Sequence, residues 1–209
     1  MIVLKSGQLR ERDCRSELDE FASFLLAGKD IKETDLLDFF EARPQLILLM
    51  GRLVGVEGAT QYNNETPIIG KYRADFVVSN DNNSTFAFIE FENAMESSIF
   101  TKKINKKTLA HSWSLRFEHG YSQVIDWYHH LHENNGTQNM QAEFGRHNIK
   151  YYGALIIGRA NSLNKSDCRH RFEKRIECST IYNKHITCYT FDDLYEEMEL
   201  EYQILSGFK

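Results

Sequence analysis

Residues 72–92 read YRADFVVSNDNNSTFAFIEFE, two apolar segments on either side of a polar turn. Segments rich in Phe, Val and Ile that flank an Asn-Asp cluster are typical of a β-hairpin. Acidic residues interrupt both segments, Asp75 in the first and Glu90 and Glu92 in the second. Because neighbouring strands lie about 4.8 Å apart, we expect the hairpin to bring Asp75 and Glu90 close together.

The three acidic residues of this hairpin predict a metal site. Side chains alternate along a strand, so Glu90 and Glu92 fall on the same face. Buried carboxylates are unfavourable alone, and three that converge repel one another unless a cation lies between them. Mg²⁺ or Mn²⁺ is the natural candidate, since these hard ions prefer oxygen ligands. The alternative is a solvent-facing polar strand edge without a ligand.

The rest of the chain alternates between helical and extended patterns. Apolar residues at helical spacing predict helices over residues 16–26 and 34–44, before the hairpin. After Asn93 we expect a long helical stretch that breaks around residues 118–120. Further strands are predicted at 151–157 and 185–190, and further helices at 166–178 and from 191 onward. This order predicts an α/β (α+β) domain with a mixed central sheet flanked by helices.

Composition limits the class of protein. The chain has 209 residues, 42% of them hydrophobic, which suits one globular domain. Its longest apolar stretch, residues 46–50, is far shorter than the roughly 20 residues that a membrane span needs. Charged residues interrupt the first 15 positions, which excludes a signal peptide. We therefore expect a cytoplasmic protein with no membrane partner and with four reduced cysteines.

Charge is distributed unevenly. The net charge of −5 disfavours non-specific nucleic-acid binding, because phosphate contacts require positive side chains. One basic cluster recurs at helical spacing and predicts a phosphate-facing stripe: Lys102, Lys103, Lys106 and Lys107. A solvated helix face explains the same pattern equally well.

The arrangement of acidic residues resembles the PD-(D/E)XK nuclease fold, which has an acid on one strand and an acid-x-lysine or acid-x-acid motif on the next. Glu41 lies on the preceding helix, where many such nucleases carry an extra metal-binding acid. Gln123, followed by Asp126 and Trp127, is similar to the glutamine-plus-aromatic motif of the RecB-like branch.

A closer resemblance covers residues 36–194, which look like the nuclease domain of the Shedu anti-phage defence family. The similar motifs are FFEARP at 39–44, GKYRADF at 70–76, IEFE at 89–92, QVIDW at 123–127, IIGR at 156–159 and YTFDDL at 189–194. The resemblance implies a nuclease-like domain over residues 31–209 after a helical extension at 1–30. It also implies hydrolysis of phosphodiester bonds in phage or plasmid DNA, a Mg²⁺ or Mn²⁺ cofactor and assembly into a homo-oligomer.

The resemblance further assigns catalytic roles. These fall on Asp75, Glu90, Glu92, Gln123 and Glu41, with Asp75, Glu90 and Glu92 as metal ligands. Arg159, after a buried strand, is a candidate to pair with acids beside Asp75 or to touch phosphate.

One position departs from the family pattern, because Glu92 stands where the motif usually has lysine. Three explanations are open. Glu92 is a metal ligand or base in an active variant, a lysine from Lys102 or Lys103 enters the site instead, or catalytic activity is lost. We expect activity, since a metal itself lowers the pKa of bound water. The alternative is an inactive nuclease-fold module that binds nucleic acid or a partner protein, and a third hypothesis is another metal-carboxylate enzyme such as a phosphatase.

Overall fold

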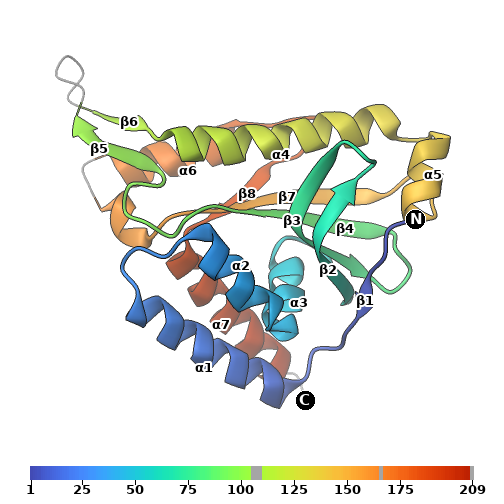
Figure 1. Ribbon diagram of the computed structural model, residues 1–209, viewed down its shortest axis with the longest axis horizontal. Helices are drawn as coiled ribbons and strands as arrows, with labels where there is room; N and C mark the ends of the chain where they lie inside the picture. The colour runs from blue at the N-terminus through green and yellow to red at the C-terminus, as the bar shows by residue number, and fades with distance from the viewer. Residues whose placement is uncertain (105–109, 165–166, 208–209) are drawn as a thin grey trace.

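A six-stranded mixed sheet forms the middle layer, in the order β1-β2-β3-β4-β7-β8 (Figure 1). The computed structural model describes residues 1–104, 110–164 and 167–207. The sheet strands are β1 (Lys5–Ser6), β2 (Ala59–Ile68), β3 (Tyr72–Asn80), β4 (Thr85–Phe91), β7 (Lys150–Ile156) and β8 (Ile186–Tyr189). Strands β1 to β4 pair antiparallel, whereas β7 lies parallel to both β4 and β8. The predicted mixed sheet is confirmed.

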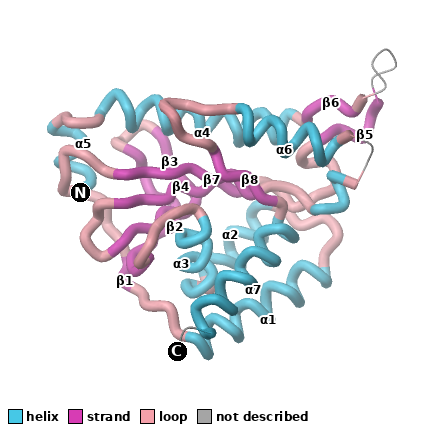
Figure 2. The backbone as a smooth tube through the Cα atoms, turned by 180° about the vertical axis from the view of Figure 1, so that it is seen from behind, coloured by secondary structure: helices cyan, strands magenta, loops and turns pink. Residues whose placement is uncertain are grey.

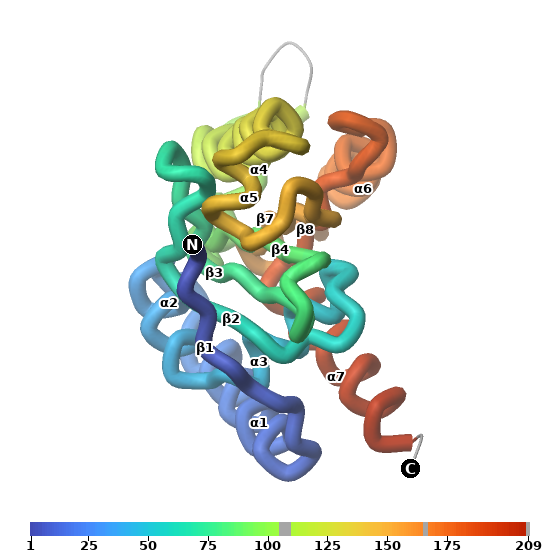
Figure 3. Tube along the Cα trace, turned by 90° about the vertical axis from the view of Figure 1, so that its right-hand side faces the viewer, coloured from blue at the N-terminus to red at the C-terminus, as the bar shows by residue number. Residues whose placement is uncertain are grey.

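Helices cover both faces of the sheet, as the views from behind and from the side show (Figures 2 and 3). One face carries α1 (Glu11–Ala27), α2 (Glu33–Glu41), α3 (Pro44–Leu53) and α7 (Phe191–Gly207). The other carries α4 (Leu115–Asn134), α5 (Gln138–Phe144) and α6 (Cys168–Cys178), with a short 3₁₀ helix, η1 (Ala160–Leu163). The α/β layering that the sequence predicts is therefore present.

Each face of the sheet has its own hydrophobic core. Along β4, Ala87 and Ile89 face the core shared with α1, α2, α3 and α7, whereas Phe86 and Phe88 face the core beneath α4 and α5. This alternation follows from the pleat of the strand. It places Glu90, two residues after Phe88, on the α4 side of β4.

The β3–β4 hairpin forms as the sequence predicts. The Asn80 side chain closes its turn, because Asn80 Oδ1 accepts hydrogen bonds from the backbone N–H of Ser84 at 3.0 Å and of Thr85 at 3.2 Å. Asn83 has a φ of 53°, a left-handed conformation that asparagine tolerates better than most residues. The turn fixes the register in which Phe76 pairs with Ile89.

The segment after Asn93 differs from the prediction of a long, broken helix. Residues Phe100–Ile104 form β5 and His111–Trp113 form β6, an antiparallel pair at one end of the molecule (Figure 1). Non-local contacts favour the strands, since the Phe100 and Trp113 rings stack with centroids 4.3 Å apart. Helix α4 then continues through Gly120 without the predicted break.

No described helix is both long and apolar enough to cross a membrane.

Candidate functional site

Asp75 and Glu90 lie just past the end of the β3–β4 ladder. The last paired residues are Phe76 and Ile89, so Asp75 and Glu90 occupy the next opposite positions. Instead of a continued ladder, Asp75 Oδ2 accepts a hydrogen bond from the backbone N–H of Phe91 at 2.7 Å. The aspartate carboxylate therefore replaces a backbone partner and is held against β4.

Both carboxyl groups are difficult to ionise in this setting. Burial raises the pKa of Asp75 to about 7, against the opposing effect of the Phe91 hydrogen bond. Burial, followed by repulsion from Asp75, raises the pKa of Glu90 to about 10. Glu90 is only 7% exposed, and its Oε2 atom has no hydrogen-bond partner among the described residues. Asp75 therefore has one backbone donor, whereas Glu90 Oε2 has no donor among the described residues that would stabilise its ionised form.

A divalent ion fits this pair better than it fits the full trio. Hard cations accept carboxylate oxygens, and Mg²⁺ commonly takes only one or two carboxylates and completes its shell with other oxygens. In the described part of the chain, no three His, Cys, Asp or Glu side chains already stand together as a metal site. Asp75 and Glu90 are thus the candidate ligands, and their binding of an ion stays a prediction. The role of Glu92 as a third ligand stays a prediction.

Glu92 has partners of its own on α4. Its Oε2 accepts a hydrogen bond from Arg116 Nη1 at 3.2 Å, and its Oε1 lies 3.3 Å from His119 Nδ1. The Arg116 guanidinium also lies 4.0 Å from the carboxylate of Glu33, the first residue of α2. Glu92 is therefore a buried anion that is paired with a cation, unlike Glu90.

Glu41 and Gln123 approach the site from two helices. Glu41, the last residue of α2, is exposed and lines a surface pocket together with Asp75, Asp38 and Glu65. Gln123 is half-buried on α4, seven residues after Arg116, which places the two on the same side of the helix. Glu41 and Asp75 line the same pocket, and Gln123 lies on the helical face that contains the partners of Glu92.

Sequence reasoning missed three residues of this site, Glu33, Arg116 and His119. Burial, followed by repulsion from Glu92, raises the pKa of Glu33. The Glu33 backbone N–H donates to Asn93 Oδ1 at 2.7 Å, which ties the start of α2 to the end of β4. A signal for the α4 residues existed, because Arg116, His119, Gly120 and Gln123 recur at intervals of one helical turn.

Of the four lysines, the structure describes two, Lys102 and Lys103. Lys102 and Lys103 are exposed on strand β5, not on a helix as expected, whereas Lys106 and Lys107 fall outside the described residues. The β5–β6 pair is anchored by stacked rings, since Trp113 also lies 4.6 Å from Phe117 of α4. A role for the lysines in nucleic-acid binding stays a prediction.

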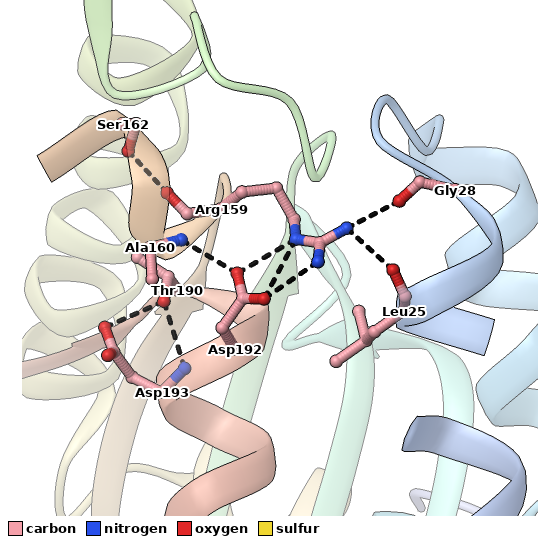
Figure 4. Close-up of polar contacts among 8 residues, drawn as sticks. All are labelled: Leu25, Gly28, Arg159, Ala160, Ser162, Thr190, Asp192 and Asp193. Atoms are coloured by element: carbon pink, nitrogen blue, oxygen red, sulfur yellow. Dashed lines mark hydrogen bonds and ion pairs between the residues drawn. The ribbon is translucent and has the colours of Figure 1, made fainter. Parts of the chain in front are cut away.

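Arg159 does not pair with the acids beside Asp75. Figure 4 shows its guanidinium between Asp192 and the backbone carbonyls of Leu25 and Gly28. Its Nη2 meets Asp192 Oδ1 at 2.8 Å, and its Nη1 donates to Gly28 O at 2.6 Å and to Leu25 O at 3.1 Å. These contacts give Arg159 a structural role, so the suggested pairing with the carboxylate site was wrong.

Comparison with known proteins gives one family. Residues 30–195 match the family model described as Shedu protein SduA, C-terminal. The matched span contains every carboxylate described above and the α4 residues that contact Glu92. No curated protein matches the chain.

Proposed function

This chain belongs to the Shedu family through its SduA C-terminal region, and from that premise we propose that it is a metal-dependent nuclease of anti-phage defence. The proposal includes a PD-(D/E)XK-like core, for which the antiparallel β2–β3–β4 meander, the α4 crossover and the parallel strand β7 are the supporting features. The substrate is phosphodiester bonds, in phage or plasmid DNA, reached in the cytoplasm.

The observation that carries the proposal is the pair of opposed carboxylates, Asp75 and Glu90, with a buried and unpaired Glu90 oxygen. Two buried carboxyl groups whose ionisation is costly become good ligands once a cation lies between them. A bound Mg²⁺ or Mn²⁺ supplies positive charge to the scissile phosphate and makes water a better nucleophile at neutral pH.

The residues of the chain then have separate tasks. Asp75 and Glu90 hold the ion, and the Phe91 N–H keeps Asp75 in place. Glu41 borders the pocket that leads to Asp75, where it serves as an outer ligand or orients water. Gln123 donates a hydrogen bond to the attacking water or to the phosphate from α4. Glu92 borders the same site, where it serves as a further ligand or positions its partners on α4.

The test uses supercoiled plasmid with Mg²⁺ or Mn²⁺ and the full chain beside Asp75→Asn and Glu90→Gln. These variants keep the shape of each side chain but remove its negative charge. We expect the wild type to cleave and each variant to lose about a hundredfold in rate, because each ligand contributes several kcal/mol of charge stabilisation.

Asp81→Asn is the matched control, since Asp81 is exposed at the other end of the same hairpin. It should cleave like the wild type. Cleavage that persists in both site variants would overturn the assignment of Asp75 and Glu90.

A second candidate function is an inactive module of the same fold that binds nucleic acid or a partner protein. The pairing of Glu92 with Arg116, at a position where the family motif has lysine, favours it. DNA binding without cleavage by any form of the protein would support this alternative. Self-assembly is part of either proposal on family grounds, and light scattering of the purified chain measures it.

A further inference from the structure

Arg116 has two acidic neighbours but uses one nitrogen for both. Its Nη1 lies 3.2 Å from Glu92 and 4.0 Å from Glu33. A guanidinium carries donors on three nitrogens, and no hydrogen bond to a described residue engages Nε or Nη2 of Arg116. Its side chain is 53% exposed, whereas that of Glu92 is 6% exposed. Arg116 therefore contacts a buried carboxylate on one side and is open to the solvent on the other.

The position of Arg116 is set by the start of α4. Ser114 caps the helix, because its Oγ accepts a hydrogen bond from the backbone N–H of Phe117 at 3.0 Å. One turn later the helix backbone touches the site directly. A Cβ atom on Gly120 would lie 2.7 Å from Leu155 Cδ1 and 3.2 Å from Glu92 Cγ. This close approach places α4, and with it Arg116, against Glu92.

Arg116 also borders an open surface pocket. The pocket is lined by Lys32, Glu33, Thr34, Asn93, Met95 and Arg116. Asn93 and Glu92 directly follow the end of β4, where Glu90 lies. A group that enters this pocket therefore meets the guanidinium that contacts Glu92, two residues along the chain from Glu90.

We propose that Arg116 is the phosphate-binding cation of this site, that its free edge contacts the nucleic-acid backbone, and that Glu92 is the positioning residue that holds it there. The inference rests on the proposed function and names the residue that supplies the positive charge where the family motif has lysine. A guanidinium suits the role because its planar fork matches the oxygens of a phosphate.

Arg116 suits this role better than Lys102 or Lys103 do. The two lysines are exposed on β5, and a free lysine loses rotamer freedom when it binds. Arg116 is already held by Glu92, so it loses less conformational entropy when it contacts phosphate.

Binding of a short labelled DNA duplex in Ca²⁺, measured by fluorescence anisotropy over a range of salt concentrations, tests the inference without cleavage. We expect Arg116→Ala to weaken binding about tenfold and to reduce the salt slope by about one, as loss of one phosphate contact requires. Arg116→Lys should keep the wild-type salt slope with intermediate affinity, because it retains the charge but loses the fork.

Two further variants separate a phosphate contact from damage to the fold. Arg12→Ala, which removes an exposed arginine on α1, should bind like the wild type. The double variant Arg116→Ala with Glu92→Gln removes the cation together with its buried anion, so it should fold and still show the loss. Thermal unfolding checks each variant.

Unchanged affinity and salt slope in both Arg116→Ala forms would overturn the inference, as would a wild type that binds no nucleic acid. A wild type that binds through Arg116 but cleaves nothing with Mg²⁺ or Mn²⁺ would leave the inference supported while the nuclease proposal fails.

Discussion

Glu17 of α1 is a half-buried carboxylate outside the candidate site, and its hydrogen-bond partners differ from those of Glu90. Its Oε2 accepts a hydrogen bond from the backbone N–H of Leu46 at 3.1 Å, in the first turn of α3. Burial nevertheless raises its pKa to about 7, against the opposing effect of the backbone hydrogen bonds. Donors from a helix N-terminus thus stabilise the charge of Glu17, whereas Glu90 Oε2 has no donor among the described residues.

This difference gives a pH prediction for Glu17→Gln. The folded state binds a proton on Glu17 more tightly than the unfolded state does. The contribution of Glu17 to the free energy of unfolding is therefore fully present below about pH 4.5 and is lost as the pH rises towards 7. Glu17→Gln removes that dependence. Between pH 4.5 and 7, the free energy of unfolding of the variant should rise relative to that of the wild type by on the order of 1 kcal/mol, a figure reduced because Glu17 is only partly buried.

Urea unfolding of both proteins at pH 5 and pH 8 measures this gain. Glu57→Gln, which changes an exposed residue, should show the same offset from the wild type at both pH values. An advantage of Glu17→Gln that grows towards low pH would contradict the prediction.

Helices α3 and α4 contain glycines at positions where a β-carbon has no room. A Cβ atom on Gly51 would lie 2.3 Å from Val78 Cγ1, and one on Gly120 would lie 2.7 Å from Leu155 Cδ1. Gly207, at the end of α7, would meet nothing within 4 Å. The glycines of α3 and α4 are therefore required by the packing of each helix on the sheet.

Alanine substitutions at the three glycines should separate helix propensity from packing. Alanine is preferred over glycine in a helix interior by about 1 kcal/mol, whereas overpacking costs about 1–3 kcal/mol. We expect Gly207→Ala to be neutral in stability, Gly120→Ala to lose about 1 kcal/mol and Gly51→Ala to lose about 2 kcal/mol, since a β-branched valine yields least. Urea unfolding gives the order, and a stabilised Gly120→Ala would show that α4 does not lie against Glu92.

The same elements show what sequence could and could not predict. The positions of Asp75 and Glu90 at the end of the hairpin were predictable, because a hairpin with a strong turn sets its own register locally. The sequence suggested a break in α4 at Gly120, because its contact with Leu155 is not visible in a local pattern. Strand β5 was missed for the same reason, since its stability depends on Trp113 and on Arg171 of α6, whose guanidinium lies 4.9 Å from the Phe100 ring.

In the whole molecule, the N-terminal helix shares a core with the family-matched region. The match begins at residue 30, yet Phe21 of α1 packs against Phe40 and Tyr195 with ring centroids 5.0 Å and 5.8 Å apart. The division into an extension over residues 1–30 and a domain over 31–209 stays a prediction. The contacts mean that α1 contributes directly to the stability of the layer that supports α2.

Arg159 links α1, α7 and the end of β7 through polar contacts. It follows β7, bonds to Asp192 at the start of α7 and holds the carbonyls of Leu25 and Gly28 at the end of α1. Burial would raise the pKa of Asp192, but hydrogen bonds from Arg159 and the Ala160 N–H outweigh it and lower that pKa. The carboxylate is therefore ionised and paired, and one side chain joins three segments that are distant in sequence.

Loss of the Arg159 contacts should lower the local stability of α1 more than that of the sheet. Arg159 is 15% exposed, so Arg159→Ala leaves a partly buried, unpaired Asp192 and should cost about 3 kcal/mol. Lys174→Ala, which breaks a pair that is 53% and 60% exposed, should change stability by less than about 0.5 kcal/mol. Hydrogen exchange distinguishes a local from a global effect. Amides at the end of α1 should exchange faster in Arg159→Ala by more than those of β4, and a uniform change across both elements would show that Arg159 is not the specific anchor of the N-terminal helix.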